Sequence, residues 1–380
     1  MAFHSFSFLL FFPIVTLVYF LLPSKIRWLF LLAASYYFYM CWNARYVFLI
    51  ALSTVITYAC ARLADSLQNA KLRLLAILLG LGSNLGILFF FKYCRFAIEL
   101  LNRVFGLLNV PALPLPNILL PVGISFYTFQ ALGYMLDVYR RKLPAEKNLL
   151  RYALFVSFFP QLVAGPIERS ENLLRQVNHP GSFSWDNAIS GLCVMLLGFF
   201  EKLVVADRAA IYVNAVFSRW HEAAGWQLFL AAAAFSFQIY GDFSGYSHIA
   251  IGASRVLGYN LMENFRQPFF ADSIRDFWHR WHISLSTWFR DYLYIPLGGG
   301  RAGKARKALN TLITFSVSGL WHGASLSFFV WGLLNGIVQI LESLLPKRAK
   351  PLPPPPPYSA HPFYMDMRLS HLCLLPRHIA

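Results

Sequence analysis

Charged residues are scarce in this sequence. Only 13% of its 380 residues are Asp, Glu, Lys or Arg, whereas 57% are hydrophobic. A soluble globular domain has about 25% charged and about 45–50% apolar residues. The scarcity of charge therefore excludes an ordinary soluble domain. It indicates an all-α, polytopic membrane protein whose surplus apolar side chains face lipid.

Cysteine is scarce as well. The five cysteines lack the close spacing of a metal-binding or redox motif, and they are Cys41, Cys60, Cys94, Cys193 and Cys373. This pattern gives no support for a thiolate metal site or a thiol nucleophile. We interpret these residues as small apolar groups that pack between membrane helices.

Acidic residues are the rarer charge, with 17 Asp and Glu against 33 Lys and Arg, for a net charge of +16. In a soluble protein this balance would suggest nucleic-acid binding. Here the basic residues gather in short loops at Lys25 to Arg27, Arg62 to Arg73, Arg140 to Lys142, Arg301 to Lys307 and Lys347 to Arg348. The positive-inside rule predicts that Arg140–Lys142 is cytoplasmic and that the N-terminus lies outside. No nucleic-acid partner is expected.

Long apolar runs supply the predicted membrane helices. A spanning helix needs about 20 apolar residues, and shorter runs can be tilted, re-entrant or buried by neighbours. No Lys or Arg precedes Phe6, so the first helix is expected to be retained rather than cleaved as a signal. We predict spans at Phe6–Leu22, Trp28–Trp42, Tyr46–Ala61, Leu74–Phe91, Leu119–Leu136, Tyr152–Val163, Ile189–Phe200, Trp226–Tyr240, Leu309–Leu320 and Leu326–Leu345.

Polar residues interrupt the apolar sequence in two places. Around Asp242, the stretch "QIYGDFSGYSHIAIGASRVLGY" mixes Gly, Ser and His into a predicted helix. Such residues at membrane depth are costly and usually face an interior pathway. The segment Asn264–Gly300 is too charged to span and too aromatic to be a free loop. We predict interfacial or re-entrant amphipathic helices there, with Asp272 as a helix N-cap.

Two local patterns resemble ligand sites. "GGGRAGKA", Gly298 to Ala305, nearly has P-loop spacing, but it lacks the Ser or Thr after Lys304 and no predicted strand precedes it. A basic cytoplasmic turn is the better interpretation. Asp276, His279 and His282 have i, i+3, i+6 spacing, but adjacent arginines oppose a cation. We predict no metal site and interpret them as a polar wall that binds or polarises a substrate.

His322 lies in the apolar stretch "SVSGLWHGASLSFFVWGLLNG". Imidazole titrates near neutrality, and Gly323 beside it leaves room for a substrate to approach the ring. Ionisable residues inside a membrane are candidates for function. The residues alone leave two alternatives open: a catalytic base, or a structural histidine hydrogen-bonded to a neighbouring helix.

Five motifs identify a family resemblance. They are "PVGISFYTFQALGYMLDVYR", "FFPQLVAGPIER", "YGDFSGYSHIAIG", "RDFWHRWHISLSTWFRDYLYIPLGG" and "LWHGAS". In this order they resemble the membrane-bound O-acyltransferase family over about residues 1–345. The similarity is greatest to the bacterial branch that contains the alginate O-acetylation membrane subunit, and next to the D-alanyl transfer protein of teichoic acid modification.

The resemblance implies a ring of membrane helices around a central funnel, formed by residues 1–345. It also implies catalytic roles for His322 and His282. His322 would act as general base, and His282 or Asn335 would donate to the oxyanion. We expect substrate contacts from Trp321, Asp276, Asn335, Asp242 and Arg280. A serine acyl-enzyme through Ser316 or Ser325 is the rival mechanism.

The implied reaction moves an acyl group, acetyl in the alginate-like branch, from a cytoplasmic thioester such as acetyl-CoA to a hydroxyl outside. No bound cofactor is expected. The resemblance also implies an extracytoplasmic acetyltransferase partner, a polysaccharide acceptor and location in the cytoplasmic (inner) membrane. D-alanyl transfer to teichoic acid is the alternative within the family. A transporter or flippase is the alternative of another class, because broken helices with internal charges also suit a substrate path.

The sequence departs from the family pattern in three places. His248 stands where the family usually has Asp, and His279 stands where it usually has Arg. After about Leu345, where relatives continue through further membrane helices, residues 346–380 form a proline-rich tail that cannot span. We expect this tail to be disordered and the chain to be truncated at that end, which keeps an inactive scaffold among the hypotheses.

Overall fold

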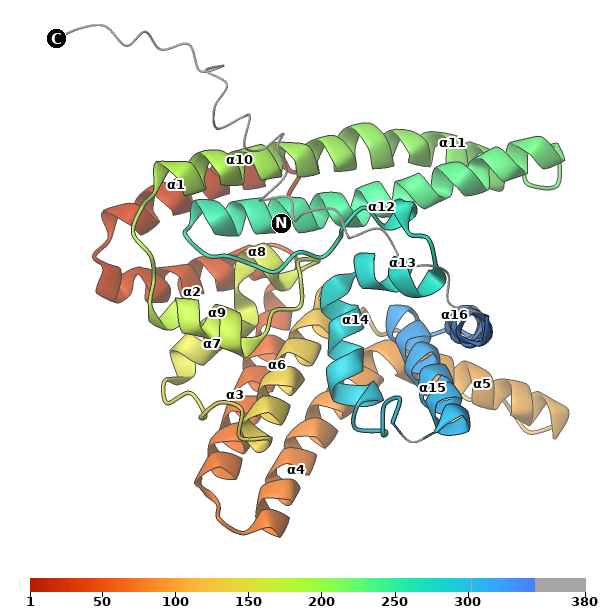
Figure 1. Ribbon diagram of the computed structural model, residues 1–380, viewed down its shortest axis with the longest axis horizontal. Helices are drawn as coiled ribbons and strands as arrows, with labels where there is room; N and C mark the ends of the chain where they lie inside the picture. The colour runs from red at the N-terminus through yellow and green to blue at the C-terminus, as the bar shows by residue number, and fades with distance from the viewer. Residues whose placement is uncertain (302, 346–380) are drawn as a thin grey trace, which may run out of the picture.

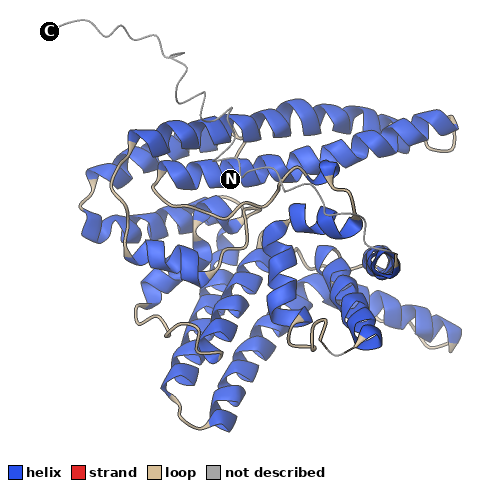
Figure 2. Ribbon diagram, viewed as in Figure 1, coloured by secondary structure: helices blue, strands red, loops and turns tan. Residues whose placement is uncertain are grey.

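The computed structural model describes residues 1–301 and 303–345, so the predicted tail at 346–380 lies outside the described residues. This part of the chain is helical throughout and has no strands (Figure 1, Figure 2). Its first half comprises α1 (Phe6–Leu21), α2 (Ser24–Met40), η1 (Ala44–Tyr46), α3 (Val47–Ser66), α4 (Ala70–Leu88), η2 (Phe89–Tyr93), α5 (Cys94–Leu107), α6 (Ile124–Tyr139), α7 (Leu149–Ser157), α8 (Phe159–Leu162) and α9 (Ser170–Asn178).

The second half contains the longest helix and ends in a helical hairpin. Its elements are α10 (Trp185–Phe200), η3 (Glu201–Ala206), α11 (Asp207–Phe217), α12 (Gly225–Val256), η4 (Pro268–Phe270), α13 (Ile274–Arg280), α14 (Ile283–Phe289), η5 (Arg290–Tyr294), α15 (Lys304–His322) and α16 (Leu326–Leu344). The short helices α13 and α14 agree with the amphipathic, non-spanning segment predicted for Asn264–Gly300.

Four continuous helical segments are long and apolar enough to cross a membrane: Ala44–Ser66, Ala70–Leu107, Trp185–Phe217 and Leu326–Leu344. Most of their residues are not buried inside the protein, so their apolar side chains face outward, as lipid contact requires. The chain is thus a multi-pass membrane protein. Each of these segments contains or nearly coincides with one predicted span, and α1 is a shorter apolar helix.

Two predicted spans differ in the structure from one long apolar helix. At Leu119–Leu136, helix α6 starts only at Ile124 and is buried along almost its whole length. Tyr152–Val163 is divided into α7, of nine residues, and α8, of four, both too short to cross a membrane. Pro160 explains the break, because it cannot donate a backbone hydrogen bond to a continuing helix. An apolar segment in a protein core has the same composition as one in lipid.

Glycine allows the long helices to pack at close range. Helices α10 and α12 lie side by side in Figure 1, and a Cβ at Gly252 would sit 2.5 Å from the Gly191 carbonyl oxygen. In the α15–α16 hairpin, a Cβ at Gly319 would sit 2.3 Å from the Phe328 carbonyl oxygen. Small residues at these crossings permit the backbone contact that drives helix association in lipid.

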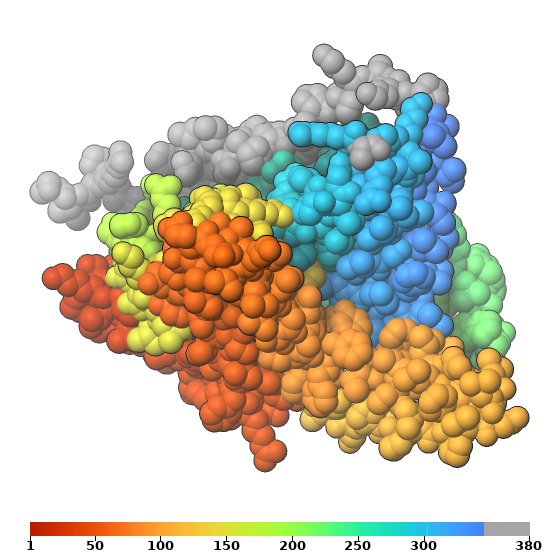
Figure 3. All heavy atoms as spheres, turned by 90° about the horizontal axis from the view of Figure 1, so that it is seen from below, coloured from red at the N-terminus to blue at the C-terminus, as the bar shows by residue number. Residues whose placement is uncertain are grey.

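Three π-helical segments interrupt the helices, at η2, η3 and η5. Such bulges are rare, and they often mark functional positions. The first one, η2, joins α4 to α5 and contacts the end of α15, where the Tyr93 hydroxyl donates to the Leu320 carbonyl over 2.9 Å. Figure 3 shows the same neighbourhood on the molecular surface, with the orange α4–α5 segment beside the blue α15–α16 pair.

Candidate active site

His322 is the last residue of α15. The chain then turns through Gly323 to Ser325, whose hydroxyl accepts from the Phe328 amide as the N-cap of α16. The Nε2 atom of His322 is buried and has no hydrogen-bond partner among the described residues. A structural histidine would be expected to use that atom. The capping role of Ser325 gives no support to the rival serine mechanism.

His282 occupies the junction between α13 and α14. Its backbone is left-handed, with φ 45° and ψ 55°, a conformation that costs a non-glycine residue about 1–3 kcal/mol. The side chain is fully buried, and its Nδ1 atom lies 3.1 Å from Asn264 Oδ1. The Ser284 backbone N–H, which can only donate, points to the same Asn264 atom over 3.3 Å, and this identifies the atom facing the ring as Oδ1.

This hydrogen bond assigns a role to His282. Because Asn264 Oδ1 can only accept, Nδ1 of His282 carries the proton. In the neutral ring Nε2 is then an acceptor, and it is buried without a partner. His282 therefore presents a lone pair, which can orient a hydroxyl group. It does not present the donor that the sequence-based oxyanion role requires.

Trp321 completes a compact cluster with the two histidines. Ring centroids are 6.3 Å apart for His282 and His322, 6.0 Å for His282 and Trp321, and 5.1 Å for Trp321 and His322. The indole Nε1 of Trp321 is also buried without a hydrogen-bond partner. Buried polar atoms are almost always paired, so three unpaired nitrogens in one place suit a site that hydrogen-bonds a substrate. We call these three residues the His–Trp cluster.

Lys92 borders the His–Trp cluster and was missed in the sequence. It projects from η2, and its ammonium donates to the Ser125 hydroxyl over 2.9 Å and to the Trp321 carbonyl. The ammonium also lies 5.3 Å from the centroid of the Trp321 ring. No carboxylate among the described residues lies within 4.0 Å of it. A lone lysine in the apolar run "LGILFFFKYC" is the signal that could have found it.

Capping the end of α15 does not explain the charge of Lys92. A cation at a helix C-terminus contributes roughly 0.3–1 kcal/mol. Removing an ammonium ion from water costs several kcal/mol, so the cap alone does not offset part-burial of the charge. A neutral donor would satisfy the same carbonyl, as Tyr93 does for Leu320. The positive charge next to Trp321 therefore needs another explanation.

Asp276 and Arg280, predicted to contact substrate, pair with each other. Arg280 Nε lies 2.7 Å from Asp276 Oδ2, an i, i+4 ion pair within α13. The helix ends at Arg280, so His282 does not share a helix face with Asp276 and His279 as the spacing had indicated. The described residues include no cluster of His, Cys, Asp and Glu able to hold a metal.

Two other predicted contact residues form polar contacts outside the His–Trp cluster. Asp242, on α12, accepts from Lys202 over 2.5 Å, and Lys202 also pairs with Asp207 at 2.9 Å. Asn335, on α16, donates to the Trp331 carbonyl of its own helix. Trp331 itself packs edge-on against His322, with centroids 5.3 Å apart. The structure therefore gives Asp242 and Asn335 partners of their own.

His248, which departs from the family pattern, has a hydrogen-bond partner in the structure. Glu201, on η3, faces α12 and accepts hydrogen bonds from Ser244 and from His248 Nδ1, both over 2.7 Å. A histidine here pairs with the glutamate, whereas the aspartate usual in the family would face it as a like charge. We call Glu201 and its neighbours the paired cluster, which comprises Glu201, Lys202, Asp207, Asp242, Ser244 and His248.

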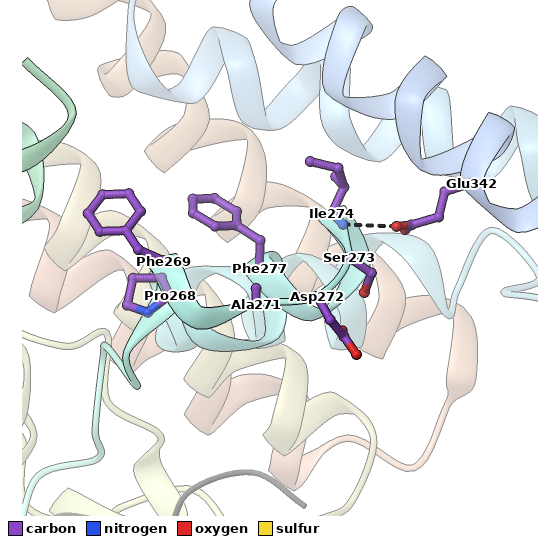
Figure 4. Close-up of a pocket in the computed structure, with 8 residues that line it drawn as sticks. All are labelled: Pro268, Phe269, Ala271, Asp272, Ser273, Ile274, Phe277 and Glu342. Atoms are coloured by element: carbon purple, nitrogen blue, oxygen red, sulfur yellow. Dashed lines mark hydrogen bonds between the residues drawn. The ribbon is translucent and has the colours of Figure 1, made fainter. Parts of the chain in front are cut away.

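A cavity of about 450 Å³ lies beside α13, apart from the His–Trp cluster (Figure 4). Glu342 of α16 points into it and accepts from the Ile274 and Arg275 amides over 2.9 and 3.0 Å. The predicted N-cap Asp272 is wrong by one residue, because Ser273 accepts from the Asp276 amide. The cavity is lined by Pro268, Phe269, Ala271, Asp272, Ser273, Ile274, Phe277 and Glu342.

Basic loops converge at one end of α6. Arg73 donates to the Tyr139 carbonyl over 2.7 Å, which joins the Arg62–Arg73 loop to Arg140–Lys142. Arg140 donates to the Asp291 carbonyl over 3.0 Å, and this links both loops to η5. Asp65, Asp137 and Asp291 pair with some of these basic groups, but basic residues outnumber them, so this end forms a basic rim of the kind that the positive-inside rule places at the cytoplasm.

The fold and the His–Trp cluster define a multi-pass membrane protein with an unsatisfied imidazole site inside its helices. The profile of the MBOAT, membrane-bound O-acyltransferase family, matches residues 139–357. The chain is 40% identical to a probable alginate O-acetylase AlgI of Pseudomonas putida, over 93% of this chain and 74% of that protein. The chain belongs to the membrane-bound O-acyltransferase family, a family of acyl-transferring enzymes.

Two more relatives are named for other acceptors, and their sequences are less similar to this chain. A peptidoglycan O-acetyltransferase of Helicobacter pylori is 34% identical, over 86% of this chain and 67% of the relative. A teichoic acid D-alanyltransferase of Bacillus subtilis is 27% identical, over 62% of each chain. Similarity is therefore greater to the two acetylating relatives than to the D-alanylating one.

Proposed function

We propose that this protein transfers an acetyl group from a cytoplasmic thioester, acetyl-CoA or another acyl carrier, to a hydroxyl of a cell-surface or exopolysaccharide. The observation that carries the proposal is the His–Trp cluster, with three buried nitrogens lacking partners in a family of O-acyltransferases. The two acetylating relatives support acetyl as the acyl group and a polysaccharide as the acceptor. The lower similarity to a D-alanyltransferase disfavours D-alanyl transfer, and family membership disfavours a transporter.

His322 is the general base in this mechanism. Its unpaired Nε2 takes the proton of the acceptor hydroxyl while the hydroxyl oxygen attacks the acyl carbon. The carbonyl electron pair moves to oxygen, and the resulting tetrahedral intermediate collapses by breaking the carbon–sulfur bond. The imidazolium then returns its proton to the departing thiolate. General-base assistance of this kind contributes about 10²–10⁴-fold to the rate.

His282 positions the acceptor sugar for this attack by accepting a hydrogen bond from a second, neighbouring hydroxyl, because the proton of the attacking hydroxyl goes to His322. Its Nδ1–H is held by Asn264, and its buried Nε2 offers the acceptor. The indole N–H of Trp321 is free to donate to an acyl oxygen. These assignments keep both histidines neutral in the resting site and give each unpaired nitrogen a partner in the substrate complex.

The basic rim suits entry of a phosphate-bearing donor. Arginines on α4, α6 and η5 gather where the positive-inside rule places the cytoplasm. A coenzyme or carrier thioester carries phosphate groups, and basic side chains attract them. We infer a central funnel that connects this rim to the His–Trp cluster, in the cytoplasmic membrane, with an extracytoplasmic acetyltransferase completing delivery to the polymer.

The decisive experiment measures alginate acetylation in a producing strain that lacks its own O-acetylase. The full chain is expected to restore polymer-bound acetyl. His322→Gln keeps hydrogen bonding but loses basicity, so acetylation should fall by about 10²-fold or more at unchanged protein amount. His221→Gln, at an exposed loop histidine, is the matched control. Normal acetylation by a well-expressed His322→Gln variant would reject the general-base assignment.

A further inference from the structure

We propose that Lys92 is a catalytic residue whose ammonium stabilises the oxyanion of the tetrahedral intermediate. The inference rests on the proposed function and deepens it. Acyl transfer requires donors at the acyl oxygen. The Trp321 indole is a neutral one, and the two other residues that the sequence suggested for this role are occupied or unsuited. His282 presents an acceptor, and Asn335 donates to its own helix.

Position supports Lys92 as that donor. Its ammonium touches the carbonyl of Trp321, the residue before His322, and lies over the Trp321 ring. Its second partner, Ser125, is next to Phe126, whose ring packs edge-on against Trp321 with centroids 5.4 Å apart. Lys92 thus contacts the His–Trp cluster from η2, whereas His282 reaches it from the α13–α14 junction.

Valence and charge support the same role. An ammonium has three N–H donors, and the described contacts use two of them. The third is available to a ligand. No carboxylate of the described residues compensates the charge, so the negative charge that develops on the acyl oxygen is its natural counter-ion. When the intermediate collapses, that electron pair returns to the carbonyl and Lys92 keeps its proton.

The π-helical bulge explains how a membrane helix presents this side chain. Segment η2 interrupts the long helix Ala70–Leu107, and it holds both Lys92 and Tyr93 against the end of α15. The two neighbours offer an internal comparison. Tyr93 makes a neutral contact with the Leu320 carbonyl, whereas Lys92 makes an equivalent backbone contact and adds a charge. Of the two residues, only Lys92 adds a positive charge that can stabilise an oxyanion.

The test compares Lys92→Met, Lys92→Gln and Lys92→Arg with Tyr93→Phe as the matched control. Transfer from radiolabelled acetyl-CoA to alginate is measured in membranes, and the unfolding temperature is measured in detergent. Loss of one oxyanion donor typically lowers kcat by about 10²–10³-fold, so we expect this loss for Lys92→Met and Lys92→Gln with KM for acetyl-CoA little changed. Lys92→Arg should recover part of kcat, and Tyr93→Phe should stay close to wild type.

The other outcomes each overturn a different statement. If Lys92→Gln is as active as wild type while His322→Gln is inactive, the oxyanion role is wrong and the proposed function stands. If the Lys92 variants and Tyr93→Phe lose folded protein together, with normal activity per folded molecule, Lys92 is only a helix cap. If wild type transfers no acetyl, or His322→Gln is fully active, the proposed function fails and the role of Lys92 fails with it.

Discussion

Polar side chains are hydrogen-bonded to one another in the paired cluster, whereas the ring nitrogens of the His–Trp cluster lack such partners. In the paired cluster, Glu201 accepts from Ser244 and His248, and Lys202 bridges two aspartates. In the His–Trp cluster, the reactive nitrogens of both histidines and the indole nitrogen have no partner. Both regions place imidazoles among membrane helices. The difference indicates that the first stabilises helix packing, while the second is prepared for a ligand.

The largest expected effect in this comparison is on activity at His282. Asparagine tolerates the left-handed backbone at this position, so His282→Asn should preserve the α13–α14 junction. It removes the Nε2 acceptor, and acetyl transfer should fall by about 10²-fold through kcat, with the unfolding temperature little changed. His279→Asn, at an exposed histidine of α13, is the control. Equal activity in the two variants would assign His282 to structure alone.

The reverse pattern is expected in the paired cluster. Glu201→Ala removes the acceptor of two hydrogen bonds, which should destabilise the protein by about 1–3 kcal/mol. Activity per folded molecule should remain normal, because Glu201 bonds to Ser244 and His248 and not to the His–Trp cluster. Detergent unfolding curves and acetylation normalised to folded protein measure the two effects, with Glu222→Ala at an exposed loop as control. Loss of specific activity without loss of stability would remove the distinction between the clusters.

Composition predicted the outer part of the fold better than the inner part. The segments Ala44–Ser66 and Leu326–Leu344 meet lipid, where length and hydropathy decide the structure, and both were anticipated. Helix α6 was predicted as part of a span, and its burial was not anticipated, because an apolar sequence is the same whether lipid or protein surrounds it. Pro160 is visible in the sequence, and it divides the apolar segment Tyr152–Val163 into helices that are shorter than a membrane span.

The candidate site also has a part that the sequence could predict and a part that it could not. His322 and His282 stand out as titratable residues in apolar surroundings, so the sequence could flag them. Their approach across forty residues depends on how the α13–α14 junction lies against the C-terminal end of α15, which no local pattern encodes. The Asp276–Arg280 pair follows the i, i+4 rule and could have been predicted as a salt bridge. Lys92 could have been flagged in the same way as the histidines, because it is a single lysine in an apolar stretch.

The smallest expected effect tests a buried carboxyl outside both clusters. Glu168, in the loop before α9, accepts from the Met262 amide and from Asn172. Burial raises the pKa of its carboxyl to about 7, despite these hydrogen bonds and Arg169. Between the unfolded and folded pKa values the folded protein binds more protons than the unfolded chain. Its stability should therefore fall as the pH rises through this range.

Between pH 6 and pH 8 the contribution of Glu168 to the free energy of unfolding should decrease by about 1 kcal/mol, since the unfolded carboxyl is ionised throughout. Glu168→Gln should remove this share of the pH dependence, whereas Glu171→Gln, at an exposed residue of the first turn of α9, should leave it intact. Unfolding temperatures in detergent at several pH values provide the measurement. If Glu168→Gln and wild type keep the same pH slope, Glu168 is ionised in the folded protein, and a buried carboxylate with fixed hydrogen-bond donors then belongs with the paired groups.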